Sequence, residues 1–160
     1  MRRQIGFDRE IKPEWMDYMA SLYLKGFTEK EAREAMKEYL TSFVQGKESR
    51  RKIVNSLIRI WYKSNNKEEL TALKKDLLNM DTKSAYKAYL DLIRKSYQFF
   101  DDVYTIIRRL KRLNGDFKTK DVVNRIIEKW GDYPRVEITA SRAVKTYRMF
   151  DSAIKGNKSE

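Results

Sequence analysis

The sequence lacks two residue types altogether, cysteine and histidine, and it has only two prolines and six glycines among its 160 residues. Without cysteine there can be no disulfide, no thiolate zinc site and no thiol nucleophile. Without histidine, the commonest general base and the commonest metal ligand are missing as well. So few turn-forming residues also argue against an all-β fold, which needs many turns.

Motifs that hold phosphates or metals, or that enter membranes, are missing too. There is no glycine-rich phosphate loop and no calcium-loop pattern, and Asp101-Asp102 is an isolated acidic pair. No apolar run approaches the roughly 20 residues that span a bilayer, and charges interrupt the first residues before a signal peptide could develop. We therefore expect a cytoplasmic protein that is not an enzyme, with no cofactor, metal site, small-molecule substrate or membrane partner.

Positive charge, in contrast, is abundant. The 35 Lys and Arg residues outnumber the 23 Asp and Glu residues, which gives a net charge of +12 and a pI near 9.8. Such an excess is typical of proteins whose partner is a polyanion, namely DNA, RNA or an anionic membrane surface. The alternative is a solvated basic surface without such a partner, so the positions of the charges matter more than their number.

Apolar residues recur at helical spacing along most of the chain, and capping residues separate the segments. Pro13 suits the start of a first helix, and Thr28 with Glu31 has the form of a capping box. Asn66 and Thr119 are expected to cap later helices. The sequence predicts helices over residues 13–25, 29–44, 47–62, 67–79, 83–113, 120–130 and 140–154.

The segment 83–113 is the longest periodic one, and its seam consists of Tyr86, Leu90, Ile93, Tyr97, Phe100, Tyr104 and Ile107. It is either one long central helix or two helices with a break near residues 98–101. We assign its tyrosines, and the tryptophans on other inner faces, to the core rather than to stacking on nucleobases. The expected fold class is all-α: one compact multi-helix domain over residues 1–160, packed on this central segment.

The excess positive charge falls mainly in residues 47–65, 81–115 and 139–160. The first and last of these belong to two stretches, about residues 27–62 and 117–154, that have the form of helix-turn-helix units. In such units the second helix enters the major groove, where arginine reads guanine and the helix start holds phosphates. The expected connection 131–138 is longer than the usual turn of about 3–4 residues, which counts against a strict motif in the second unit.

The candidate DNA contacts lie at the expected starts of the two second helices. They are Lys47, Ser49, Arg50, Arg51 and Lys52 in the first unit, and Ser141, Arg142, Lys145 and Arg148 in the second. The alternative for the first cluster is a solvated face, or pairing with Glu34 and Glu38 on the preceding helix. A further basic cluster, which either contacts phosphates or only solubilises the chain, is Arg108, Arg109, Lys111 and Arg112.

Four stretches together suggest a family. They are residues 18–24, 49–54, 97–104 and 139–147, with the sequences YMASLYL, SRRKIV, YQFFDDVY and TASRAVKTY. In this pattern the chain resembles the BrxA family, an accessory component of BREX bacteriophage-defence systems. The resemblance implies an all-helical DNA-binding protein without catalytic activity that works beside larger defence proteins. It also implies that Arg50, Arg51, Lys52 and Arg142 contact DNA. The chain departs from the family at residues 149–154, which lack the Gly-Leu often found there.

We therefore expect a non-enzymatic, double-stranded DNA-binding accessory protein of prokaryotic phage defence, with other defence proteins as partners. The alternative is a helical adaptor or ribonucleoprotein subunit that binds an acidic protein surface or RNA. Geometry discriminates between them through Arg50, Arg51, Arg142 and Lys145. One shared exposed face favours nucleic acid, whereas opposite faces and pairing with carboxylates favour the adaptor.

Overall fold

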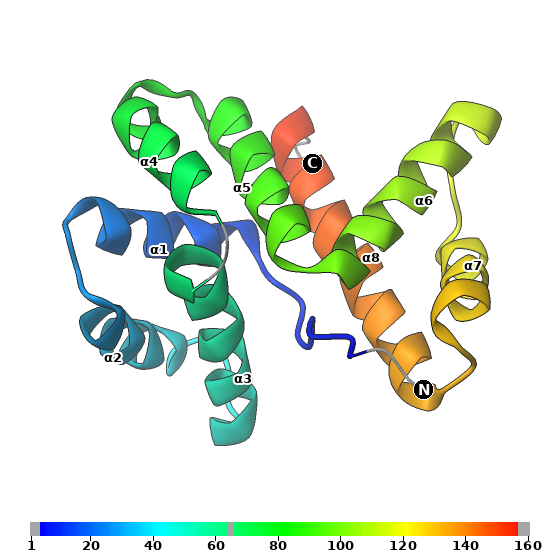
Figure 1. Ribbon diagram of the computed structural model, residues 1–160, viewed down its shortest axis with the longest axis horizontal. Helices are drawn as coiled ribbons and strands as arrows, with labels where there is room; N and C mark the ends of the chain where they lie inside the picture. The colour runs from blue at the N-terminus through cyan, green and yellow to red at the C-terminus, as the bar shows by residue number, and fades with distance from the viewer. Residues whose placement is uncertain (1–3, 64–65, 157–160) are drawn as a thin grey trace.

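A computed structural model describes residues 4–63 and 66–156, which are helical almost throughout and contain no β-strand (Figure 1). The predicted all-α fold class is confirmed. The α-helices are α1 (Pro13–Leu24), α2 (Glu29–Leu40), α3 (Lys47–Ile58), α4 (Lys67–Asp76), α5 (Thr82–Ser96), α6 (Gln98–Asn114), α7 (Thr119–Trp130) and α8 (Pro134–Lys155). A π-helical stretch, Arg59–Lys63, extends α3, and a 3-10 turn, Leu77–Asn79, extends α4.

The helices surround a central pair, α5 and α8, which lie side by side (Figure 1). Helices α1 to α4 lie on one side of this pair, and α6 and α7 lie on the other. Helix α2 packs along α3, and α7 packs along α8. The buried apolar side chains of all these parts form one continuous cluster. The helix-turn-helix-like units are thus joined through a shared core.

Local sequence signals mark several of the helix starts. Pro13 occupies the first turn of α1, where its missing N–H costs nothing. The capping box at α2 is confirmed, since the N–H of Glu31 donates to Thr28 Oγ1 (3.2 Å) and the N–H of Thr28 donates to Glu31 Oε1 (2.9 Å). Asp81 caps α5 by accepting from the N–H of Ser84 (2.8 Å).

The long central segment is two helices, not one. Tyr97 has an extended backbone (φ −135°, ψ 107°) and separates α5 from α6, one residue before the range in which a break was considered. Its side chain is buried, and its hydroxyl donates to the backbone oxygen of Ser56 (2.9 Å) on α3. The guanidinium of Arg59 lies 4.8 Å from its ring centre. Tertiary contacts to α3 and the stretch after it thus hold the residue at which the helical path changes direction.

The last helix begins earlier than predicted. It starts at Pro134 rather than near residue 140, because proline at the first helical position needs no N–H partner and its fixed φ suits a helix. The connection before it is therefore only residues 131–133, not 131–138. At 22 residues, α8 is the longest helix described, and Arg142 lies well inside it instead of in its first turn.

Two predicted caps do not form, and the α-helices predicted over residues 29–44 and 67–79 end earlier than expected. Thr119 lies inside the first turn of α7 and provides no cap. Asn66 occupies the N-cap position of α4, but its buried side-chain amide donates to Ser96 Oγ (2.8 Å) and to the Leu92 oxygen (3.3 Å) and makes no capping hydrogen bond. Phe43 and Leu78 are 61% and 83% exposed, because α2 ends at Leu40 and α4 ends at Asp76, before either residue.

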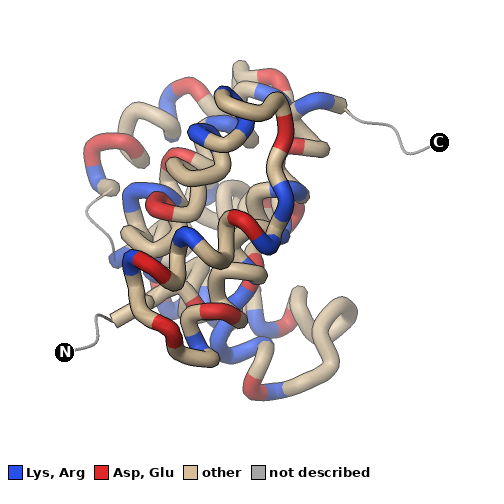
Figure 2. Tube along the Cα trace, turned by 90° about the vertical axis from the view of Figure 1, so that its right-hand side faces the viewer, with Lys and Arg blue, Asp and Glu red and all other residues tan. Residues whose placement is uncertain are grey.

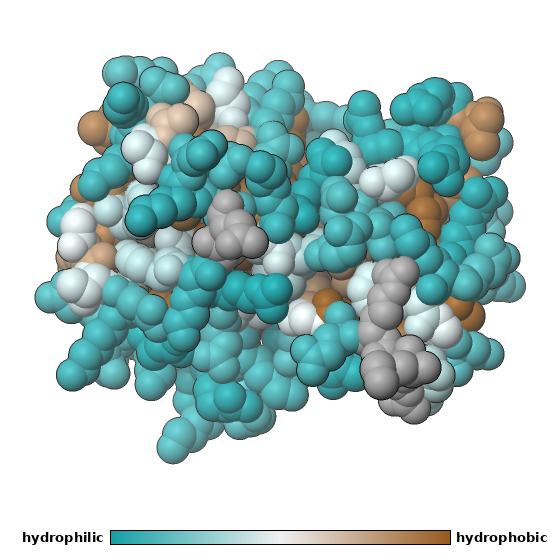
Figure 3. Space-filling view, viewed as in Figure 1, coloured by the Kyte–Doolittle hydropathy of each residue, from teal (hydrophilic) through white to brown (hydrophobic). Residues whose placement is uncertain are grey.

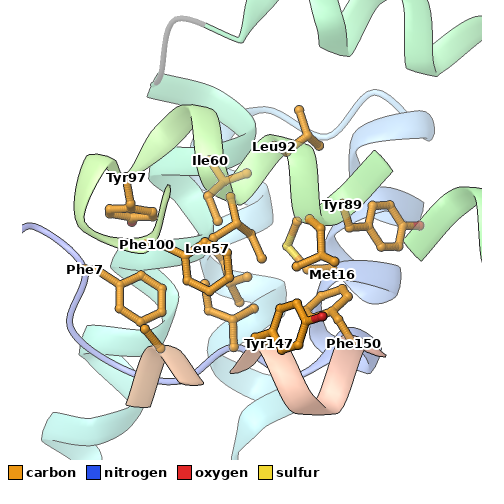
Figure 4. Close-up of a cluster of buried hydrophobic side chains, with 14 of the residues drawn as sticks. Phe7, Met16, Leu57, Ile60, Tyr89, Leu92, Tyr97, Phe100, Tyr147 and Phe150 are labelled. Carbon is orange, nitrogen blue, oxygen red and sulfur yellow. The ribbon is translucent and has the colours of Figure 1, made fainter. Parts of the chain in front are cut away.

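The segment before α1 was not predicted as part of the core, yet it is deeply embedded. Residues 4–12 pass between α3 and α8 (Figure 1). Phe7 is fully buried, with its ring centre 5.4 Å from those of Tyr97 and Phe100 (Figure 4). Ile11 is also fully buried, and its N–H donates to Thr146 Oγ1 of α8 (3.0 Å). We call residues 4–12 the N-terminal segment.

Replacing Phe7 with alanine should lower the free energy of unfolding by about 3 kcal/mol, because it removes a fully buried aromatic ring from the junction of α3, α5 and α6. Urea unfolding followed by circular dichroism measures the change. Phe43→Ala is the matched control, and it should change stability by less than about 0.5 kcal/mol because the ring is exposed. Equal effects of the two substitutions would contradict the anchoring role of Phe7.

Candidate nucleic-acid interface

The basic residues at the start of α3 have different local roles. Arg50 is used by the fold: its guanidinium donates to the backbone oxygens of Val44 (2.6 Å) and Gln45 (2.7 Å). It thereby satisfies carbonyl groups in the connection between α2 and α3. Lys47 is exposed in the first turn, and Ser49 is half-buried beside the capping residue Gly46. Arg50 therefore holds the connection between α2 and α3, and this role engages part of its guanidinium.

Arg51 and Lys52 pair with carboxylates that do not belong to α2. Arg51 pairs with Glu48 one turn earlier, and Lys52 Nζ lies 3.8 Å from Asp8 in the N-terminal segment. The hydrogen bond from Arg51 lowers the pKa of the Glu48 carboxyl below its ordinary value, and nearby Lys52 and Arg9 lower it further. No ion pair among the described residues joins this cluster to Glu34 or Glu38. The predicted alternative of pairing with α2 is thus not what the structure contains.

The groove between α2 and the start of α3 carries both signs of charge. Lys37, Lys47, Arg50 and Arg51 line it together with Glu34, Glu38 and Glu48. The face that includes α2 and α3 is almost entirely hydrophilic along its lower edge (Figure 3). The mixture of charges makes this groove a weak attractor for a polyanion by itself.

The basic residues of α8 form a stripe along one face of the helix. Arg135, Arg142 and Lys145 recur with Ile138 at heptad-like spacing, so all four lie on one side. Arg135 and Lys145 are 61% and 65% exposed, and Ile138 is 51% exposed. The stripe faces the N-terminal segment, since Lys145 Nζ lies 3.0 Å from Glu10 Oε2.

The remaining candidates on α8 lie off this stripe. Arg148 projects toward the start of α7, where its guanidinium lies 4.2 Å from the Phe117 ring centre and 3.4 Å from Thr119 Oγ1. Ser141 is exposed and makes no side-chain hydrogen bond within the described chain. On α6, Lys111 Nζ donates to the Tyr147 hydroxyl (3.2 Å). Arg148 and Lys111 are thus partly engaged in packing α6 and α7 against α8.

The two sets of basic residues meet at Asp8. Its carboxylate lies 3.8 Å from Lys52 of α3, 3.3 Å from Arg135 of α8 and 3.8 Å from Arg142 of α8. Arg142 also donates to the backbone oxygen of Asp8 (2.9 Å). We call Asp8, Lys52, Arg135 and Arg142 the Asp8 cluster. It brings together three cations from two distant helices around one carboxylate.

The positions of the four residues expected to distinguish DNA binding from an adaptor role favour neither function alone. Arg142 and Lys145 contact the same stretch of the N-terminal segment, as a shared basic face requires. Arg50 bonds to the connection between α2 and α3, and Arg51 lines the groove beside α2. Arg51, Arg142 and Lys145 each pair with a carboxylate, as the adaptor interpretation requires. Both α3 and α8 begin at the same lower edge of the molecule in Figure 1. On the side of α6 and α7, by contrast, basic and acidic residues are interspersed (Figure 2).

Sequence reasoning missed Asp8 and Arg135, which connect the cluster. A signal for Asp8 was present in the apolar residues on either side of it, Phe7 and Ile11, which indicate a buried segment. Arg135 directly follows Pro134, and the assignment of that proline to a loop hid it from the α8 stripe. No local sequence pattern indicates that Asp8 and Arg142 lie close together, because they are distant in sequence.

Among the described residues, no group of three or more acidic side chains is placed to hold a metal ion, and no helix has the length and apolarity needed to cross a membrane. No protein-family model, no curated protein and no solved structure matches this chain.

Arg50→Ala should lower the urea midpoint of unfolding, by an amount equivalent to about 1 kcal/mol, because two backbone oxygens lose a charged donor. Arg51→Ala is the control on the neighbouring residue, and it should leave the midpoint unchanged because its pair with Glu48 is exposed. If Arg51→Ala destabilises the protein and Arg50→Ala does not, Arg50 does not clamp the connection between α2 and α3.

Proposed function

We propose that this chain is a non-enzymatic protein that binds double-stranded DNA, and that it does so with the face where α3, α8 and the N-terminal segment meet. The observation that carries this proposal is the Asp8 cluster, in which three cations share one carboxylate. Nearby, Lys145 extends the same face along α8, and Arg51 extends it along α3. A duplex supplies a dense row of phosphates that can neutralise such a surplus.

One feature of the structure supports the helix-turn-helix interpretation, and another contradicts the residues expected to enter the groove first. The connection between α7 and α8 is short, residues 131–133, which fits the usual turn better than the length expected from the sequence. However, Ser141 and Arg142 are too far from the start of α8 to be the first residues into a groove. Arg135, in the first turn, takes that position.

The wider role is proposed on sequence grounds alone. The resemblance of four stretches to the BrxA family supports a role as an accessory protein of prokaryotic phage defence in the cytoplasm, beside other defence proteins. The absence of cysteine and histidine from the sequence supports binding rather than catalysis.

One observation favours the second candidate, an adaptor or ribonucleoprotein subunit that binds an acidic partner surface or RNA. Arg51, Arg142 and Lys145 already pair with carboxylates of this chain, as they would pair with carboxylates of a partner. The test of DNA binding therefore includes an RNA duplex of the same sequence. The major groove of duplex RNA is deep and narrow and does not admit a helix.

The test is fluorescence anisotropy with a random 20-base-pair DNA duplex across a range of salt concentrations. The logarithm of the binding constant should fall linearly with the logarithm of salt, with a slope of about 0.9 per phosphate neutralised. The double substitution Arg51→Ala/Lys145→Ala should weaken binding and reduce the slope by about two such steps. Arg50 is not substituted because it holds the connection between α2 and α3.

The matched control is Lys75→Ala/Lys83→Ala, which removes the same charge from α4 and the start of α5, at the opposite edge of the molecule (Figure 1). It should keep most of the affinity. No binding at low salt would overturn the proposal for the isolated chain. Equal losses from both double variants would mean that overall charge, rather than this face, attracts DNA. Equal affinity for the RNA duplex would favour the second candidate.

A further inference from the structure

The Asp8 cluster has more positive charge than its single carboxylate can neutralise. Lys52, Arg135 and Arg142 approach Asp8, whose side chain is only 19% exposed. The three contacts are 3.3 to 3.8 Å long, whereas charge-assisted hydrogen bonds of this kind are usually about 2.7–2.9 Å. The carboxylate thus attracts three cations without forming a close hydrogen bond to any of them.

The backbone, rather than these ion pairs, holds Asp8 in place. Phe7 and Ile11 anchor the N-terminal segment on either side of it, since both are fully buried. The N–H of Ile11 donates to Thr146, and Arg142 donates to the backbone oxygen of Asp8. The carboxylate is therefore fixed next to the cations whether or not it holds them, so another anion has to compete with it.

The cations themselves retain unused capacity. Arg135 is 61% exposed and has only a long contact to Asp8, so most of its donors face solvent. Arg51 also lies close enough for the Asp8 charge to act on it. An incoming anion would find several donors and a net positive charge that Asp8 only partly offsets.

We infer that Lys52, Arg135 and Arg142 form a phosphate-binding site, and that Asp8 is a built-in counterion that competes with a phosphodiester group for it. This inference rests on the proposed function and identifies where one backbone phosphate of the duplex binds. A single phosphate ion gains little by competing with a fixed neighbouring carboxylate. A duplex places many phosphates along the face at once, so it competes effectively. Asp8 therefore lowers affinity for isolated anions more than for a polyanion.

The experiment compares Asp8→Asn with Glu10→Gln in the same anisotropy assay. Both substitutions are nearly isosteric, remove one negative charge, and lie in the N-terminal segment. Glu10 contacts one cation, Lys145, whereas Asp8 contacts three. Asp8→Asn should tighten DNA binding about five- to tenfold at low salt and steepen the salt dependence by about one phosphate. Glu10→Gln should tighten binding no more than about twofold.

A competition experiment distinguishes binding of duplex phosphates from binding of free inorganic phosphate. Inorganic phosphate at equal ionic strength should displace DNA measurably from Asp8→Asn but not from the original protein. If Asp8→Asn fails to fold in a circular dichroism check, Arg135→Ala replaces it, because that side chain is exposed. Arg135→Ala should then weaken DNA binding and reduce the salt slope by about 0.9.

The outcomes separate this inference from the proposed function. Equal tightening by Asp8→Asn and Glu10→Gln would show that only net charge matters, and it would overturn the counterion role while DNA binding stands. Weaker binding by a folded Asp8→Asn would mean that Asp8 organises the face instead of competing for it. If the Asp8→Asn variant binds DNA and the original protein does not, the counterion role is supported and Asp8 blocks binding in the unaltered chain. Failure of every variant to bind would overturn both proposals.

Discussion

The N-terminal segment has to lie between α3 and α8 before either helix can present its basic residues as observed. Phe7 fills the junction near Tyr97 and Phe100, and Ile11 bonds to Thr146 of α8. With the backbone fixed at these two points, Asp8 reaches cations of both helices. The apolar anchors thus supply the stability, while the exposed ion pairs contribute little by themselves. The position of Asp8 among these cations depends on two buried side chains that carry no charge.

The surface charge would repel itself if it were left uncompensated, since the chain carries a net +12. The structure distributes carboxylates among the cations on the face near the N-terminal segment. Glu48 pairs with Arg51, Glu10 pairs with Lys145, and Asp8 lies among three bases. Such an arrangement lets a strongly basic face remain stable without a ligand and still leaves a local excess of positive charge. It also means that a count of basic residues overstates the number available to a partner, as Arg50 shows by bonding to its own backbone.

Features set by neighbouring residues could be predicted from the sequence. The capping box at Thr28 and the start of α1 at Pro13 depend on contacts within a few residues, and the structure confirms them. The break at Tyr97 is held by α3 and the N-terminal segment, so local periodicity could not place it. The candidate interface was predicted only in its parts. Lys52 and Arg142 were named, but Asp8, which connects them, was not, because ion pairing across so long a separation in sequence leaves no periodic pattern.

The hydrogen bond from Ile11 to Thr146 spans 135 residues of sequence. During synthesis the N-terminal segment emerges well before α8, which supplies Thr146, Arg135 and Arg142. Closing such a long loop is slow because chain entropy must be lost before the contact forms. A nascent chain therefore carries Ile11 without Thr146 and Asp8 without Arg135 and Arg142 until α8 is complete. A chain that stops before α8 cannot assemble the Asp8 cluster, because two of its three cations lie on that helix.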